Sequence, residues 1–97
     1  MHAVSRTYSG QGASELVDRV LAASAEVEGL LRGVEGFVSY TLFRTEDGGV
    51  TVTVCQDKAG TDGSLRVARD WIAANASDTG VGAPTVAEGP VGMHLNE

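Results

Sequence analysis

The sequence predicts one α+β domain whose elements follow in the order strand, helix, strand, strand, helix, strand. Three observations support this order. Apolar residues alternate at the start, the middle and the end of the chain, as in strands with one buried face. They recur at helical spacing over 13–32 and 65–76. The acidic-glycine run at 46–49 lies between two alternating segments, which is typical of a hairpin because glycine accepts positive φ.

The first half of the chain contains a strand and a long helix. His2 to Tyr8 alternates, which places His2, Val4, Arg6 and Tyr8 on one face. After a glycine-containing loop, a helix is expected from Ala13 to Arg32, with Gly33 as its C-terminal cap. Its apolar stripe consists of Leu16, Val17, Val20, Leu21, Val27 and Leu31.

The second half begins with the hairpin strands 36–45 and 50–57, which carry apolar residues on both faces, as a sheet covered on both sides requires. A loop is expected over 59–64. A second helix is expected from Leu65 to Asn75 or Ala76, with Ser64 as candidate N-cap. After a flexible loop, the last strand is expected over 85–95, with a break at Gly89-Pro90 as one possibility.

These elements predict a ferredoxin-like βαββαβ fold, a four-stranded antiparallel sheet with two helices on one face, occupying residues 1–97 as a single domain. A chain of this size buries only roughly 60–65% of its unfolded surface. The sheet face without helices then needs a cover. We therefore expect a homodimer formed through the open sheet face.

Composition excludes several classes of function. Thirteen acidic residues oppose seven basic ones, for a formal charge of −6, and no basic cluster exists, which disfavours nucleic acids and anionic membranes as partners. No segment approaches the ~20 apolar residues of a membrane span, and the N-terminus does not resemble a signal peptide. Cys55 is the single cysteine, so no internal disulfide is expected and a reducing, cytoplasmic location fits.

Trp71 and Asn75 form the first candidate site. They lie four residues apart and therefore on one helix face. An amide within an apolar stripe needs a hydrogen-bond partner. In the favoured interpretation Asn75 caps the end of the helix and Trp71 belongs to the core. In the other, Asn75 is a polar group of a pocket beside Trp71.

Arg6 and the two histidines are the other polar candidates. Arg6 on an apolar sheet face either meets an acid or faces a wet cavity, because burying it unpaired is unfavourable. The first and last strands are expected to be antiparallel neighbours, which could bring His2 near His94. No carboxylate at a helpful spacing completes a metal site there, so two exposed histidines are the preferred interpretation, and no metal is predicted.

The run 34–44, read Val-Glu-Gly-Phe-Val-Ser-Tyr-Thr-Leu-Phe-Arg, resembles the second strand of the dimeric α+β barrel proteins of the antibiotic-biosynthesis-monooxygenase-like (ABM-like) family. The 50–55 strand and the Trp-bearing helix extend the resemblance over nearly the whole chain. It implies homodimers with sheets packed face to face. Some members are cofactor-independent monooxygenases acting on polycyclic phenols, others degrade haem, and many have no known activity. The monooxygenases carry an Asn one turn before the Trp, where this chain has Val67.

The sequence thus favours a small homodimeric protein that binds a small hydrophobic or aromatic molecule, or acts as an accessory module. The alternative is a cofactor-independent monooxygenase-like enzyme with an aromatic substrate. No cofactor is predicted and no catalytic residue is assigned. The candidate pocket consists of Trp71, Asn75, Arg6, Tyr8 and Tyr40.

Overall fold

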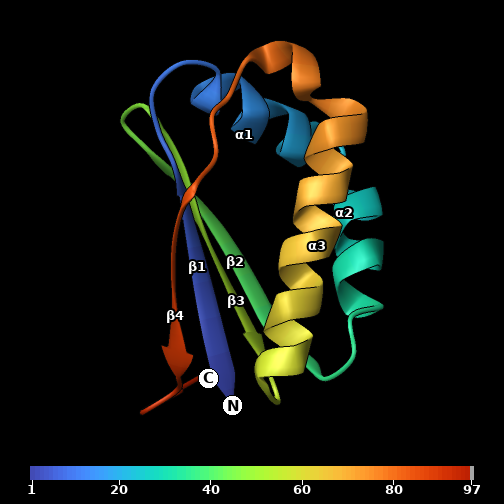
Figure 1. Ribbon diagram of the computed structural model, residues 1–97, viewed down its shortest axis with the longest axis vertical. Helices are drawn as coiled ribbons and strands as arrows, with labels where there is room; N and C mark the ends of the chain where they lie inside the picture. Colours follow the sequence, from blue (N-terminus) through green and yellow to red (C-terminus); the bar gives the residue numbers. More distant parts are fainter. Residues whose placement is uncertain (97) are drawn as a thin grey trace.

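The computed structural model describes residues 1–96 and confirms a four-stranded antiparallel sheet with its helices on one face (Figure 1). The spatial order of the strands is β2-β3-β1-β4. The strands are β1 (His2–Tyr8), β2 (Phe37–Thr45), β3 (Gly48–Cys55) and β4 (Thr85–Pro90). The helices are α1 (Ala13–Ala22), α2 (Ser24–Arg32) and α3 (Lys58–Asn75), followed by the short 3₁₀ helix η1 (Ser77–Thr79).

The central strand β1 contributes three buried side chains to the interface between the sheet and the helices. It pairs with β3 on one side and β4 on the other, so that Arg6 lies opposite Thr51 and Val86. Its alternate residues Val4, Arg6 and Tyr8 are buried on the helix-covered face. Because successive strand residues point to opposite faces, this register places Arg6 in the middle of the sheet–helix interface.

The expected continuous helix over 13–32 is wrong: it is divided into α1 and α2 at Ala23. The backbone of Ala23 leaves the helical region, with φ −106° and ψ 27°. Figure 1 shows the consequence, since α1 crosses one end of the sheet and α2 then turns down beside α3. A straight helix of this length would extend about 30 Å. It would carry the only buried residue of α2, Leu31, away from the core.

The hairpin is confirmed, but the expected role of its glycines is wrong. Thr45 pairs with Gly48, so the turn consists of Glu46 and Asp47, and Gly48 and Gly49 belong to β3 without positive φ. A Cβ on Gly48 would lie 2.0 Å from the carbonyl oxygen of Tyr8. These glycines therefore permit close packing of the hairpin against β1 and α1.

The second predicted helix begins seven residues earlier than expected, at Lys58, so the expected loop over 59–64 is wrong. Asp57 caps the helix by accepting a hydrogen bond from the Gly60 amide at 3.1 Å. Ser64, the expected N-cap, lies inside the helix and donates its hydroxyl to the Thr61 carbonyl at 2.7 Å. The small residues of this segment, which suggested a loop, allow the first turns of α3 to approach the sheet closely.

The chain ends depart less from expectation. Strand β4 ends at Pro90, at the break that Gly89-Pro90 suggested, rather than continuing to Leu95. Both termini lie at the same end of the sheet (Figure 1). Gly33 does end α2, with an ordinary right-handed backbone conformation. Within residues 1–96, no helix combines the length and apolar character needed to cross a bilayer.

Candidate functional site

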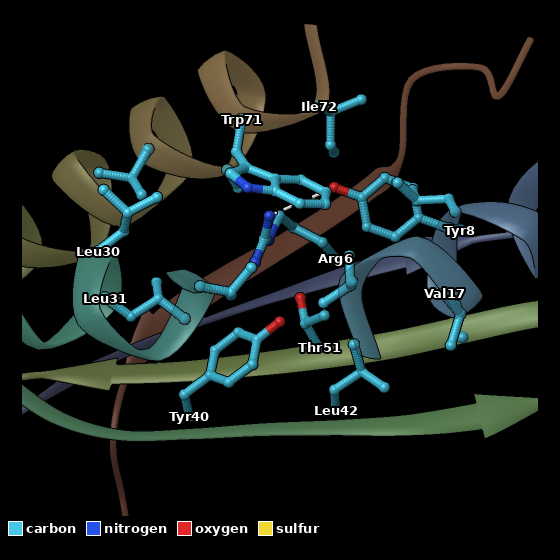
Figure 2. A pocket seen from close by; sticks show the side chains of 16 residues that line it. Arg6, Tyr8, Val17, Leu30, Leu31, Tyr40, Leu42, Thr51, Trp71 and Ile72 are labelled. Carbon is cyan, nitrogen blue, oxygen red and sulfur yellow. Dashed lines mark hydrogen bonds between the residues drawn. The ribbon is translucent and has the colours of Figure 1, made fainter. Parts of the chain in front are cut away.

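A small cavity lies between the helix-covered face of the sheet and the helices (Figure 2). Its volume is about 40 Å³. Most of the wall is apolar and comes from all three helices and from β1, β2 and β3. The polar or amphipathic side chains in the wall are Arg6, Tyr8, Tyr40, Thr51 and Trp71. The structure thus brings together four of the five candidate residues, from β1, β2 and α3, around one space.

Arg6 is the most unusual residue of this cavity. It is only 4% exposed, and its Nη1 donates to the Tyr8 hydroxyl at 3.3 Å. Its Nε is buried without an acceptor, and within residues 1–96 no carboxylate forms an ion pair with it. Of the two possibilities predicted from the sequence, an acid partner or a wet cavity, the structure shows no acid partner within residues 1–96 and places Arg6 in the wall of a mostly apolar cavity. An unpaired buried charge of this kind typically costs several kcal/mol.

Trp71 covers the cavity from α3. It is 8% exposed, which confirms the predicted burial on the sheet-facing side of the helix. Figure 2 shows the Arg6 guanidinium beneath the indole ring. The indole Nε1 is buried and has no hydrogen-bond acceptor. Indole and guanidinium N–H groups only donate, so both residues present donors that nothing in the described chain accepts.

Tyr40 and Thr51 form the floor of the cavity. Burial raises the pKa of Tyr40, and the positive charge of Arg6 partly opposes this effect. The phenol is neutral near pH 7. Figure 2 shows its hydroxyl directed toward Arg6, where the oxygen faces a donor and can only accept. The Thr51 hydroxyl is buried without a partner. Thr51 is not among the residues predicted from the sequence; the β1–β3 pairing, which places it opposite Arg6, is the signal that identifies it.

Asn75 does not line the cavity, so the prediction that it is a polar group of the pocket is wrong. Its side-chain amide donates to the Trp71 carbonyl at 3.0 Å, one turn back in the same helix. Its own carbonyl accepts a hydrogen bond from Arg19 at 2.9 Å. These contacts match the favoured alternative, in which Asn75 closes the end of the helix. It is exposed because α3 ends there and turns into η1.

The two histidines do not contact each other, and the prediction that both are exposed is wrong, because both are partly buried. Nδ1 of His2 lies 2.9 Å from the Thr61 hydroxyl, and its Nε2 lies 3.8 Å from a Glu88 carboxylate oxygen, so its contacts do not involve His94. Across residues 1–96, no group of three or more His, Cys, Asp or Glu side chains could hold a metal ion. Cys55 is buried, and burial raises the pKa of its thiol, which keeps it protonated and unreactive.

Two larger grooves flank the cavity. One, of about 640 Å³, runs between α1, α2 and β2; the other, of about 560 Å³, runs between α3 and the β4 side of the sheet. The first shares five wall residues with the cavity: Val20, Val27, Leu31, Tyr40 and Leu42. Arg6 also lines the second groove. Helix α2, which lies between the cavity and the first groove, packs loosely, because Leu31 is its only buried residue and Leu30 is 43% exposed.

Solved structures share the architecture of this chain, whereas sequence comparisons find no match. The chain matches no protein-family model, and no curated protein matches its sequence. A protein of unknown function from Nitrosomonas europaea aligns over 99% of this chain and 92% of its own, with a TM-score of 0.69 and 13% identity. The ActVA-Orf6 monooxygenase of Streptomyces coelicolor, solved with nanaomycin D, aligns over 99% and 91%, with a TM-score of 0.64 and 22% identity.

A third solved structure is MhuD with two manganese protoporphyrin IX molecules per active site. It aligns over 99% of this chain and 98% of its own, with a TM-score of 0.66 and 17% identity. At these sequence identities, structural similarity establishes the fold, whereas activity has to be argued from the residues of the site. The element order, the strand order and these alignments lead to one conclusion: the chain has the ferredoxin-like α+β fold of the antibiotic-biosynthesis-monooxygenase-like proteins.

Proposed function

We propose that this protein binds a small aromatic molecule between its sheet and its helices, beneath Trp71. One observation carries the proposal: Arg6 and Trp71 hold buried donors without acceptors inside a largely apolar cavity. A residue pair that served only as core packing would leave these groups unsatisfied at a cost of about 1–3 kcal/mol each, and more for the charge. A bound molecule with an acceptor oxygen and a flat apolar body satisfies both features.

The cavity, at about 40 Å³, is much smaller than the roughly 300–1,000 Å³ of ordinary small-molecule sites, so an aromatic ligand requires the wall to move. Helix α2 is the part of the wall that can move at least cost, because it buries little and separates the cavity from the adjoining groove. Displacement of α2 joins the two spaces and produces a pocket in the size range of ordinary small-molecule sites, roughly 300–1,000 Å³. Ligand binding is therefore expected to be coupled to movement of α2.

A second candidate function is cofactor-independent monooxygenation of an aromatic substrate. It is favoured by the ActVA-Orf6 monooxygenase, which shares the fold and was solved with nanaomycin D. In this chain, Arg6 would stabilise negative charge developing on a substrate oxygen. Val67, which lines the cavity, stands where the resemblance implies an Asn, so the site lacks that amide. Haem is a poorer fit, because no histidine lines the cavity.

Tryptophan fluorescence tests the binding proposal directly, since Trp71 is the single tryptophan of the chain. Titration with planar naphthols and quinones is expected to give a saturable change in its emission. Ala68 lines the cavity, and Ala68→Leu fills the space and should weaken that change. Gly89→Ala on β4, where an added Cβ meets nothing within 4 Å, is the matched control. Emission that shows no saturable change with any of these ligands would overturn the proposal.

Oxygen consumption separates the two candidate functions. The same folded protein, mixed with reduced phenolic substrates that produce fluorescence changes, should consume oxygen above the buffer rate only if it is an oxygenase. Binding without oxygen consumption supports the binding protein and contradicts the enzyme. Oxygen consumption that persists in Ala68→Leu would point to chemistry outside this cavity.

We also propose that the protein is a homodimer that acts in the cytoplasm. The face of the sheet opposite the helices supports the first part, because Phe43 is 50% exposed there and Val50 and Val52 are only half-buried. Within residues 1–96, no helix packs on this face, although Val54 at one end of it is buried. The buried thiol of Cys55 supports the second part, since the described chain does not use it in a disulfide.

A further inference from the structure

We infer that the bound molecule is an aromatic oxyanion, a carboxylate or an ionised phenol, whose oxygen pairs with Arg6. This inference rests on the proposed function and specifies the charge of its ligand. Two independent observations on the same side chains support it, one concerning charge and the other concerning hydrogen-bond direction.

The first observation is the charge balance of the basic residues. Arg19, Arg32, Arg44 and Lys58 each pair with at least one carboxylate within residues 1–96. The remaining surface arginines, Arg66 and Arg69, are exposed to water. Arg6 is the exception, being buried without a counter-ion in a protein that carries six excess acids. Guanidinium groups cannot lose their proton in proteins, so the missing negative charge has to come from outside the described chain.

The second observation is the direction of the unsatisfied hydrogen bonds. The cavity's two nitrogen atoms without partners, Arg6 Nε and Trp71 Nε1, are both obligatory donors. The Tyr40 phenol is protonated near pH 7 and its oxygen can accept from Arg6, which leaves its O–H able to donate to a ligand. A set of donors around a cation matches an acceptor that carries negative charge. A single water can accept these bonds but leaves the charge unbalanced.

The aromatic part of the ligand follows from the rest of the wall. Trp71 offers a flat indole surface, and Leu31, Leu42 and Ile72 add apolar contact. Such a wall favours a ring body, whereas a small inorganic anion would leave most of it without contacts. The ligand therefore combines one oxyanion at Arg6 with one or two fused rings against the helices.

A matched pair of ligands tests the charge requirement. 2-Naphthoate and 2-naphthamide have nearly the same shape and differ by one negative charge. Wild-type protein is expected to bind 2-naphthoate at least tenfold more tightly, as measured by Trp71 fluorescence and calorimetry. Arg6→Met should abolish this preference by weakening naphthoate binding about tenfold, while naphthamide binding changes less than about threefold. Arg6→Lys keeps the charge and should retain part of the preference; Arg66→Met on the exposed face of α3 should match wild type.

The outcomes separate the inference from the proposal on which it rests. Equal binding of both naphthalenes by wild type overturns the oxyanion while the aromatic pocket stands. Binding of neither, together with no response to naphthols and quinones, overturns both. Preference for naphthoate that survives unchanged in Arg6→Met overturns the assignment of Arg6 as the counter-ion.

A titration in the wild-type protein keeps the inference testable if Arg6→Met fails to fold, and it distinguishes phenolates from carboxylates. A chromogenic nitrophenol bound beside Arg6 should ionise at least one pH unit below its free value, which corresponds to tenfold tighter binding of its anion. Absorbance against pH, at saturating protein, measures the shift. If the pKa of the bound nitrophenol equals or exceeds its free value, a phenolate ligand is ruled out, and a preference for naphthoate then identifies a carboxylate ligand. If neither the pKa shift nor the naphthoate preference is found, the oxyanion is overturned.

Discussion

At the scale of single residues, Arg6 distinguishes this chain from an ordinary small α+β core. Its neighbours on β1, Val4 and Tyr8, pack as expected for the buried face of a central strand. Arg6 occupies an equivalent position with a charge that no described side chain neutralises. Such a residue lowers the stability of a protein that lacks a counter-ion for it, and the proposed oxyanion ligand would account for its presence.

Replacement of Arg6 by Met should therefore raise the free energy of unfolding of the unliganded protein, by about 1–3 kcal/mol. Met has a similar length and fills the same space without the charge. Urea denaturation of the two proteins measures the difference. Arg66→Met, at an exposed site on α3, should change stability by less than about 0.5 kcal/mol. A loss of stability in Arg6→Met would show that Arg6 serves the fold itself.

Tyr40 predicts a specific alkaline response. Its pKa in the folded state is raised above the ordinary value of 10.0, mainly by burial. The folded state therefore holds its proton more tightly than the unfolded state, and this contribution is fully present below the unfolded pKa. It decreases as pH rises from about 10 through the folded pKa, because the unfolded state ionises first.

Tyr40→Phe should remove this part of the alkaline destabilisation. Urea midpoints measured at about pH 8 and again above about pH 10.5 provide the comparison, with wild type falling further than the variant. The raised pKa of Cys55 acts in the same direction and remains in both proteins, so it cancels in the difference. Equal losses in wild type and Tyr40→Phe would contradict the burial of a neutral phenol at this site.

At the scale of elements, the helices use glycine in two opposite ways. Gly29 lies within α2, where an added Cβ meets nothing within 4 Å. Gly60 lies in the first turn of α3, where an added Cβ would lie 2.6 Å from the Glu35 carbonyl oxygen and 2.7 Å from Cys55 Cβ. The first is an ordinary weak point of a helix, and the second is a contact that sets the distance between α3 and the sheet.

The same substitution should therefore have opposite effects in the two helices. Gly29→Ala is expected to stabilise the protein by about 0.5–1 kcal/mol, because alanine has the higher helix propensity. Gly60→Ala is expected to destabilise it by about 1–3 kcal/mol, because the added methyl overpacks against backbone. Thermal or urea unfolding of the pair measures both effects. Stabilisation by Gly60→Ala would show that α3 does not need its close approach to β3.

At the scale of the whole molecule, the sheet is covered on only one face. The helices occupy the face that holds Arg6, while Phe43, Val50 and Val52 point to the other. A second copy packed on that face would form a dimer with a continuous core between two sheets. An interface on the order of 2,000 Å² is expected, as in obligate small dimers.

Phe43→Asp should convert this dimer into monomers, because it places a charge in the interface. The side chain is half-exposed in a single chain, so the substitution should leave the fold of one protomer intact. Leu21→Asp on α1, at a similar exposure of 47%, is the matched control and should remain dimeric. Sedimentation at low micromolar concentration decides between the two. A folded wild-type monomer under these conditions would exclude the proposed assembly.

Local patterns in the sequence determined the type and order of the main elements. Alternation predicts the four strands, and helical spacing predicts that Trp71 faces the sheet, because both depend on residues within a few positions of one another. The fold class follows from that order and is confirmed by the structure. Arg6 could also be recognised as a problem from sequence alone, since a charge on a central buried strand always requires a partner.

Tertiary structure decided what depends on segments far apart in the chain. The break at Ala23 is one example, because Leu31 reaches the core only if α2 turns back beside α3. The start of α3 at Lys58 is another, because Asp57 caps the helix there and Gly60, which suggested a loop, packs closely against Cys55. The surroundings of Arg6 and Asn75 depend on side chains from distant parts of the sequence. These decide whether Arg6 contacts a carboxylate or lines a cavity, and whether Asn75 lines that cavity with Trp71. Charge and hydrogen-bond balance depend on all the side chains that surround a group, and therefore only the packed structure shows which residues line the candidate cavity.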